Sequence, residues 1–355
     1  MRSVFVKAAA AAALVSPAMP PVPAAAAGLA RASSQDYGEE GFQAFLPQLR
    51  ARAFAAGVSR DTINSVFPTL SFSRRTIELD QAQPGVISGS NANPPFAPYR
   101  AQHVSAALIN AGRSRYQAYH PQLQDIRRRF GVTPSVLVAI WGHETSYGAV
   151  MGNFDLLSSL ATLAYEGRRR DLFADEFVAG LKMIDRGVPR GRLKGSWAGA
   201  MGYPQFLPSV WLRTAVDFDG DGQADIWRNA PDALASIANY FSKAGWRPGV
   251  PWGVAVNVPA GLDRSALRSR TRAPRCPRVF ERHSRWLSFG EWRRLGLVSQ
   301  SGSWPRDSEM ATLIEPDGPG RTAYLTTVNY RVILDYNCSN FYALSVGLLA
   351  DAIAR

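Results

Sequence analysis

The stretch TPSVLVAIWGHETSYG, residues 133–148, predicts a helix that is buried over most of its surface. Thr133 is a favourable N-cap, and Pro134 suits the first helical position, where its missing N–H costs nothing. The residues that follow are mostly apolar, and Glu144 is the conspicuous exception. A carboxylate on the apolar face of a buried helix is unfavourable unless it is paired, solvated in a cleft or kept protonated. Two interpretations follow: Glu144 is a general acid, or it is a structural side chain that caps or pairs with a neighbouring element.

The composition is that of a globular protein with a basic surface. The 355 residues are 46% hydrophobic and 19% charged, and they suffice for two or three domains. The net charge of +12 comes almost wholly from arginine, because lysine occurs only at positions 7, 182, 194 and 243. Such a surface suits nucleic acid, anionic lipid or an acidic polymer such as a cell wall. Because no Lys/Arg block is interleaved with aromatic residues, we expect no nucleic-acid partner.

Residues 1–27 have the pattern of a cleaved secretion signal: a charged start, an apolar run and a small-residue cleavage region. No cysteine lies near that cleavage region, so we expect no lipoprotein anchor. No later run reaches the roughly 18 apolar residues that a membrane span needs. We therefore expect an exported, soluble mature protein without a membrane anchor.

Cys276 and Cys338 are the two cysteines of the chain. In an oxidising compartment such a pair favours one disulfide, worth roughly 4 kcal/mol in the chain-entropy model. The alternative is two buried free thiols.

The hydrophobic pattern predicts an α+β protein that is mainly α. An N-terminal helical region and linker occupy 28–98, and a helical core follows over 99–250, beginning with one helix over about 99–118. Short alternating runs predict a small β subdomain over 251–334. Residues 335–355 are expected to return to the core, closing the chain with an apolar helix.

A calcium-loop pattern is the sharpest local signal. Asp217, Asp219 and Asp221 stand at positions 1, 3 and 5 of an EF-hand-like loop, with Gly at position 6 and Gln223 at position 7, which offers a backbone carbonyl. Arg228 replaces the usual glutamate at position 12, and Asp232 could supply that carboxylate if the loop is longer. We expect a structural Ca²⁺ here, and the alternative is a metal-free Asp/Gly-rich turn.

Three further segments offer ligand-binding groups. Residues 195–205 are rich in small residues, which let a backbone approach a ligand closely, and Ser196, Tyr203 and Gln205 offer hydrogen bonds to a sugar. The alternative is a tightly packed turn. Residues 168–170 are three arginines that could bind a carboxylate or remain solvated. Residues 336–342 mix aromatic with amide and hydroxyl groups, which is typical of carbohydrate clefts and also of ordinary helix starts.

These motifs together resemble the membrane-bound lytic transglycosylase B family, glycoside hydrolase family 103. The resemblance covers roughly residues 40–355 and is most specific over 133–246. The matching motifs are IWGHETSYG (140–148), LATL (160–163), KGSWAGAMGYPQFLP (194–208), AVDF (215–218), DG (221–222) and IANYF (237–241).

The resemblance implies a lysozyme-like helical core, a further helical domain, an EF-hand-like loop and a small β part. It implies non-hydrolytic cleavage of the MurNAc-β-1,4-GlcNAc bond of peptidoglycan, which leaves a 1,6-anhydroMurNAc end, in the periplasm and without a catalytic cofactor. Glu144 stands at the position of the single acid and base. Glycan strands and peptide stems are the implied ligands, and other cell-wall enzymes are further candidate partners. By position in the motifs, the glycan cleft would be lined by Ser196, Gln205, Tyr240, Tyr336 and Asn337, with Arg168 and Arg169 toward the peptide stem.

The sequence departs from the family pattern at Pro204, where Gly is expected, and in a metal loop one residue longer before Asp232. The lipid-anchor cysteine is also missing. Two other functions stay open at this point: a hydrolytic muramidase, and a non-catalytic wall-binding scaffold stabilised by calcium.

Overall fold

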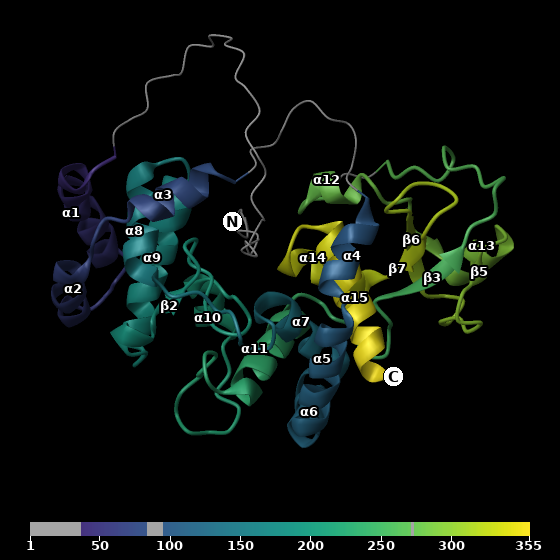
Figure 1. Cartoon of the computed structure of the whole chain (residues 1–355), viewed down its shortest axis with the longest axis horizontal. Coiled ribbons are helices and arrows are strands. Elements are labelled where there is room, and N and C mark those ends of the chain that lie inside the picture. Colours follow the sequence, from purple (N-terminus) through teal and green to yellow (C-terminus); the bar gives the residue numbers. More distant parts are fainter. Residues whose placement is uncertain (1–36, 84–94, 271–272) are drawn as a thin grey trace, which may run out of the picture.

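The computed structural model describes residues 37–83, 95–270 and 273–355. The predicted signal peptide and residues 84–94 of the predicted N-terminal region and linker lie outside these residues. The described chain is mainly helical with a five-stranded antiparallel sheet and a two-stranded one, so the predicted fold class is confirmed (Figure 1). The two-stranded sheet pairs β1 (Phe154–Asp155) with β2 (Lys194–Gly195). No helix among the described residues combines the length and the apolar character that crossing a bilayer requires.

The first three helices pack against two helices from the middle of the chain, at one end of the molecule (Figure 1). The caps Ser59 and Ser73 accept backbone N–H groups and start α2 and α3. The ring of Tyr165 lies between Phe42, Phe45 and Phe72 at centroid distances of 5.9–6.1 Å, which joins α1 to α8. The elements of this part are α1 (Glu39–Ala55), α2 (Arg60–Val66), the 3₁₀ turn η1 (Phe67–Thr69), α3 (Arg74–Gln81), α8 (Leu156–Glu166) and α9 (Arg170–Asp185).

The middle of the molecule is a helical core around α7 (Pro134–Thr145). Ten of the twelve residues of α7 are buried, as its apolar sequence predicts. The last helix of the chain, α15, packs along α7, so residues 200 positions apart form one core. The surrounding elements are α4 (Phe96–His103), α5 (Ala106–Ala118), α6 (His120–Phe130), α10 (Pro208–Thr214), α11 (Ala230–Lys243), α14 (Val328–Tyr336) and α15 (Asn340–Ala354).

The five-stranded sheet lies at the other end of the molecule and has the strand order β4-β6-β7-β3-β5, antiparallel throughout (Figure 1). Phe289 and Trp292, on the short helix α13, are fully buried in a second hydrophobic cluster beneath it. The elements of this part are β3 (Gly253–Asn257), α12 (Pro277–Phe280), β4 (Leu287–Ser288), α13 (Phe289–Arg294), β5 (Val298–Ser299), β6 (Met310–Ile314) and β7 (Tyr324–Thr326).

Two boundaries differ from the sequence-based expectation. The predicted single helix over 99–118 is two helices, because Ser105 caps a new helix by accepting the Leu108 N–H. The return to the helical core begins with α14 at Val328, inside the range assigned to the β subdomain. Thr327 caps this helix, and its apolar run 332–334 joins the main core rather than the cluster beneath the sheet.

Candidate functional site

Glu144 lies in the last turn of α7, where the helix leaves the core. The helix stops because Ser146 and Tyr147 adopt left-handed backbone conformations, with φ of 49° and 61°. The chain then folds back so that the Tyr147 ring lies against Gly142, where a Cβ atom would come within 2.5 Å of it. Glu144 is half-buried, as is His143, whereas residues 134–142 of the helix are buried. The sequence therefore places one carboxyl group at the exposed end of an otherwise buried helix.

Three tyrosines face the Glu144 carboxyl group. The buried Tyr342, in the first turn of α15, donates a 2.6 Å hydrogen bond to Glu144 Oε1. Burial, followed by the Glu144 charge, raises the pKa of Tyr99 to about 12 and raises the pKa of Tyr342 and Tyr336 as well. All three phenols therefore stay protonated near neutral pH and can act as donors.

A stack of rings supports Tyr342 and Tyr99 from behind. His103 stacks on Tyr99 at 3.9 Å and on His143 at 4.7 Å, and the His143 ring meets Tyr342 edge-on at 4.4 Å. His143 Nε2 also lies 2.9 Å from the Ser345 hydroxyl. Burial, followed by the nearby His103, lowers the pKa of His143 to about 3, so this ring is neutral in the folded protein. Sequence reasoning did not assign Tyr99 or Tyr342 to the site, although Tyr342 ends the aromatic and polar segment that it singled out.

The small-residue segment 195–205 lies against the turn that follows Glu144. Gly152 is so close to this segment that a Cβ atom there would lie 2.3 Å from the Gly195 carbonyl oxygen. Gln205, with φ of 50°, donates its amide N–H to the Met151 carbonyl at 3.3 Å, and the Tyr203 ring lies 5.1 Å from Trp141 of α7. Ser196 is half-buried and accepts the Ala200 N–H at 3.0 Å. The segment is thus a tightly packed turn that forms a wall against residues 148–152, which follow Glu144, and its binding of a sugar stays a prediction.

Tyr240, Tyr336 and Asn337 approach the same segment from α11 and α14. The Tyr336 hydroxyl donates to the carbonyl of Pro204, and the Tyr240 hydroxyl donates to the Asp335 carbonyl at 2.9 Å. Tyr336 is only 1% exposed, whereas Asn337, at the end of α14, is half-buried. Tyr336 thus braces the wall, Tyr240 braces the end of α14, and Asn337 is the half-buried member of this group.

The chain matches the model of the transglycosylase SLT domain over residues 41–351. It belongs to this family. Membrane-bound lytic murein transglycosylase B of Escherichia coli (strain K12) is 33% identical over 274 residues, which are 75% of this chain and 71% of that protein.

Solved structures of relatives agree with this assignment. SltB3 from Pseudomonas aeruginosa in complex with NAG-NAM-pentapeptide is similar with a TM-score of 0.78 and 37% identity, covering 88% of this chain and 79% of that one. The same protein with NAG-anhNAM-pentapeptide gives 0.78 and 38% over the same shares. The Escherichia coli lytic transglycosylase Slt35 in complex with calcium gives 0.70 and 29%, covering 89% and 93%.

The structure of this family member gives Arg168 and Arg169 a partner inside the protein. Both guanidinium groups pair with the carboxylate of Asp80, which is fully buried in α3. This pairing joins the start of α9 to the N-terminal helices. Both side chains keep some exposed surface, and their predicted contact with the peptide stem stays a prediction.

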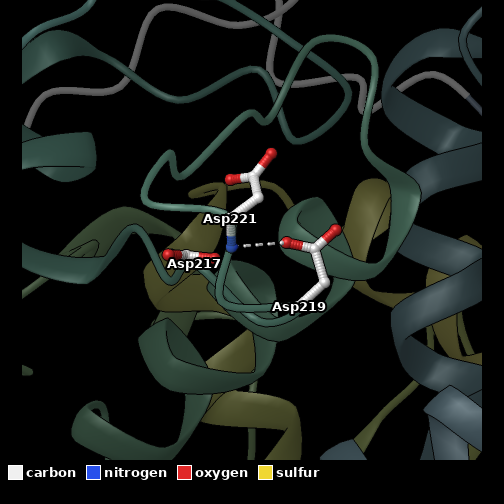
Figure 2. A group of neighbouring side chains, drawn as sticks. All are labelled: Asp217, Asp219 and Asp221. Carbon is white, nitrogen blue, oxygen red and sulfur yellow. Dashed lines mark hydrogen bonds between the residues drawn. The ribbon is translucent and has the colours of Figure 1, made fainter.

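The acidic loop is folded around its own carboxylates. Figure 2 shows Asp217, Asp219 and Asp221 together, and one oxygen of each lies within 4.8 Å of the others. The two Asp217 oxygens accept the N–H groups of Gly220 and Gly222 at 2.8 Å. Clustered carboxylate oxygens suit Ca²⁺, which prefers hard oxygen ligands.

Asp232 is buried at the base of this loop and accepts the N–H groups of Phe218 and Asp225 at 2.9 and 2.8 Å. Burial, followed by the charges of Asp219 and Asp217, raises the pKa of Asp232 to about 6. Among the described residues, the carboxylates whose oxygens lie within 4.8 Å of one another are Asp217, Asp219 and Asp221, and the Asp232 carboxylate instead accepts backbone N–H groups. The predicted Gln223 is exposed, and its carbonyl accepts the Asp225 N–H at 3.1 Å.

The predicted disulfide between Cys276 and Cys338 is present, with Cα atoms 5.6 Å apart. It joins the segment before α12 to the turn between α14 and α15, directly beside Asn337.

Proposed function

We propose that this protein is a peptidoglycan lytic transglycosylase that cleaves the MurNAc-β-1,4-GlcNAc bond without water and leaves a 1,6-anhydroMurNAc end. The observation that carries the proposal is the likeness to SltB3, whose solved complexes include NAG-NAM-pentapeptide and NAG-anhNAM-pentapeptide. Glu144, at the exposed end of a buried helix and bonded to Tyr342, supplies the carboxyl group that the reaction needs.

Glu144 acts twice in this reaction. Its carboxylic acid first donates a proton to the glycosidic oxygen, so that the GlcNAc 4-hydroxyl leaves while the substrate's own N-acetyl group stabilises the positive charge at C1. The resulting carboxylate then takes the proton of the MurNAc 6-hydroxyl as that oxygen attacks C1 and closes the anhydro ring. The attack is intramolecular, so the effective concentration of the nucleophile comes from the sugar itself.

The remaining site residues position the glycan. Tyr342 holds one carboxyl oxygen of Glu144, and Ser196, Tyr203, Gln205 and Asn337 offer hydroxyl and amide groups along the adjacent wall. Tyr240 and Tyr336 would affect glycan binding indirectly, by holding the wall and α14 in position.

A hydrolytic muramidase would need a second carboxylate near Glu144 to activate water. Asp155 is the nearest acidic residue after Glu144 in the sequence, but it caps α8 by accepting the Ser158 N–H at 2.8 Å and pairs with Arg190 at 2.7 Å. Its engagement there supports the one-carboxylate reaction.

Mass spectrometry of the products from purified sacculi tests this function. Anhydro ends without reducing ends are expected, whereas reducing ends would point to hydrolysis. A stably folded Glu144→Gln protein should release nothing; if it releases as much as the unaltered protein, Glu144 is not the catalytic carboxyl group, and if the unaltered protein itself releases no product, the function is a non-catalytic one.

We propose that the mature protein acts in the periplasm after removal of residues 1–27, and that the Asp217 loop binds a structural Ca²⁺ which takes no part in the chemistry. Melting temperatures measured with CaCl₂ and with a chelator test the second point. Calcium should raise the melting temperature of the unaltered protein and not that of Asp219→Ala, which removes the ligand oxygens at that position. Equal melting temperatures of the unaltered protein in both buffers would mean that the loop is a turn that binds no calcium.

A further inference from the structure

Exposed arginines gather on α12 and the loop that follows it. We define the basic face as the side chains of Arg278, Arg282, Arg285 and Trp286. Arg278, Arg285 and Trp286 are exposed, and Arg282 is half-buried. Within the described residues, none of the three guanidinium groups forms an ion pair with a carboxylate, and only Arg282 has a hydrogen-bond acceptor, the Pro316 carbonyl at 3.2 Å. The basic face is therefore a cluster of three positive charges without a direct ion pair, and the exposed Glu281 on the same segment offsets part of that charge.

The segment that carries this face is fixed against the N-terminal end of α15. The Cys276–Cys338 disulfide joins it to the turn before that helix. The Asn340 amide donates to the Val279 carbonyl of α12 at 2.9 Å, and Arg275 pairs with Asp335 of α14 at 3.0 Å. The basic face thus has a defined position relative to the first turn of α15, where Tyr342 lies.

Ring contacts connect the basic face to Glu144. The Arg282 guanidinium lies 5.9 Å from the centroid of the Phe341 ring, which in turn lies 5.7 Å from the ring of Tyr99. The next residue, Tyr342, bonds to Glu144. Arg282 therefore lies against the residue that precedes Tyr342, the hydrogen-bond donor to Glu144.

The outer part of the face combines charge with an aromatic surface. Arg331 of α14 lies between Phe280 and Trp286, at 3.9 and 4.9 Å from the ring centroids, and donates to the Thr312 hydroxyl at 3.1 Å. This cation holds Trp286 in place while the indole remains 39% exposed. An exposed indole beside free guanidinium groups suits a ligand with an apolar stem and carboxylates.

We propose that the basic face binds the carboxylates of the peptide stem attached to the glycan. This inference rests on the proposed function. A peptide joined to the sugar through its N-terminus keeps a free carboxylate at its C-terminus, and guanidinium groups bind carboxylates with paired hydrogen bonds. Arg168 and Arg169, the residues that the sequence suggested for this role, are already paired with Asp80.

Binding measurements in the Glu144→Gln background test the proposal, because cleavage then does not interfere. The probes are the disaccharide NAG-NAM-pentapeptide and the same disaccharide without the peptide. In the double variant Arg278→Gln/Arg285→Gln we expect the Kd for the pentapeptide ligand to rise about tenfold, as for the loss of a hydrogen bond to a charged group, and the Kd for the peptide-free ligand to stay unchanged. Added salt should weaken pentapeptide binding less in the double variant.

Arg60→Gln is the matched control, because Arg60 is an exposed arginine on α2 at the opposite end of the molecule (Figure 1). It should leave both Kd values unchanged. Unchanged binding of both ligands by the double variant would overturn the proposal, and so would an equal loss for both. A failure of the proposed function would look different: the protein with Glu144 intact would form no anhydro product from sacculi, whatever the ratio of the two Kd values.

Discussion

The hydroxyl of Tyr342 donates a 2.6 Å hydrogen bond to Oε1 of Glu144, although 198 positions separate the two residues. Glu144 is at the C-terminal end of α7, and Tyr342 is in the first turn of α15, which Ser339 caps. The orientation of the Glu144 carboxyl group therefore depends on how the last helix of the chain packs along α7.

Replacing Tyr342 with Phe should lower kcat roughly 10- to 100-fold, because a hydrogen bond to a charged group contributes about 1.5–3 kcal/mol. KM should change little, since the hydroxyl binds Glu144 rather than the sugar. Steady-state release of anhydromuropeptides measures both. Tyr330→Phe is the control: it also removes a buried hydroxyl, but one that donates to Asn340 at 3.1 Å. Equal losses of kcat in the two variants would contradict a specific role for Tyr342.

Replacing Asp80 with Ala should lower the free energy of unfolding by about 3 kcal/mol, the low end for a broken buried ion pair, because Arg168 and Arg169 can turn to solvent. Urea unfolding measures this. Arg75→Gln breaks an exposed ion pair with Glu78 on the same helix and should change stability by less than about 0.5 kcal/mol. A small effect of Asp80→Ala would contradict this role of the ion pair.

The sequence could predict what adjacent residues encode. The α7 helix, the carboxyl group at its end and the acidic loop are local patterns, and each is present in the structure. The residues that meet Glu144 could not be predicted in the same way. Tyr99 and Tyr342 come from helices on either side of α7 in the chain, and only tertiary packing brings them to one carboxyl group.

Arg168 and Arg169 illustrate the opposite limit. Three consecutive arginines suggest a free cationic loop, because a sequence does not show which carboxylate is buried nearby. Asp80 lies on an amphipathic helix and carries no sign in the sequence that it is fully buried. Arg278, Arg282 and Arg285 are not consecutive, so the sequence did not predict that they form one basic face. Their common position depends on the anchoring of α12 beside α15.

Removing the disulfide by Cys276→Ser/Cys338→Ser should lower the free energy of unfolding by about 4 kcal/mol, since a loop of this length restricts the unfolded chain. Denaturant unfolding of the variant measures the loss, and the unaltered protein with a reductant should show the same loss. If the variant and the reduced protein are both as stable as the oxidised protein, the contacts of Asn340 and Arg275 suffice to anchor α12.

Two buried histidines should make the protein less stable in mild acid. Burial lowers the pKa of both His143 and His283 to about 3. The nearby His103 lowers the pKa of His143 further, and Arg331 does the same for His283. In the unfolded chain, histidine has a pKa of about 6.5. Below that pH the unfolded state takes up protons that the folded state does not, so stability is full above pH 6.5 and falls as the pH drops toward 3.

Each histidine should contribute a slope of about 1.4 kcal/mol per pH unit, so the pair should cost roughly 2.7 kcal/mol per unit between pH 6 and 4.5. Urea unfolding at several pH values in this window measures the slope. His143→Gln removes one titrating ring while its amide can still reach the Ser345 hydroxyl, so it should reduce the slope by about 1.4 kcal/mol per pH unit even if it lowers stability at pH 7.5. If His143→Gln leaves the slope unchanged, the His143 ring accepts a proton in the folded protein. The conclusion that His143 is neutral beside Tyr342 would then be wrong.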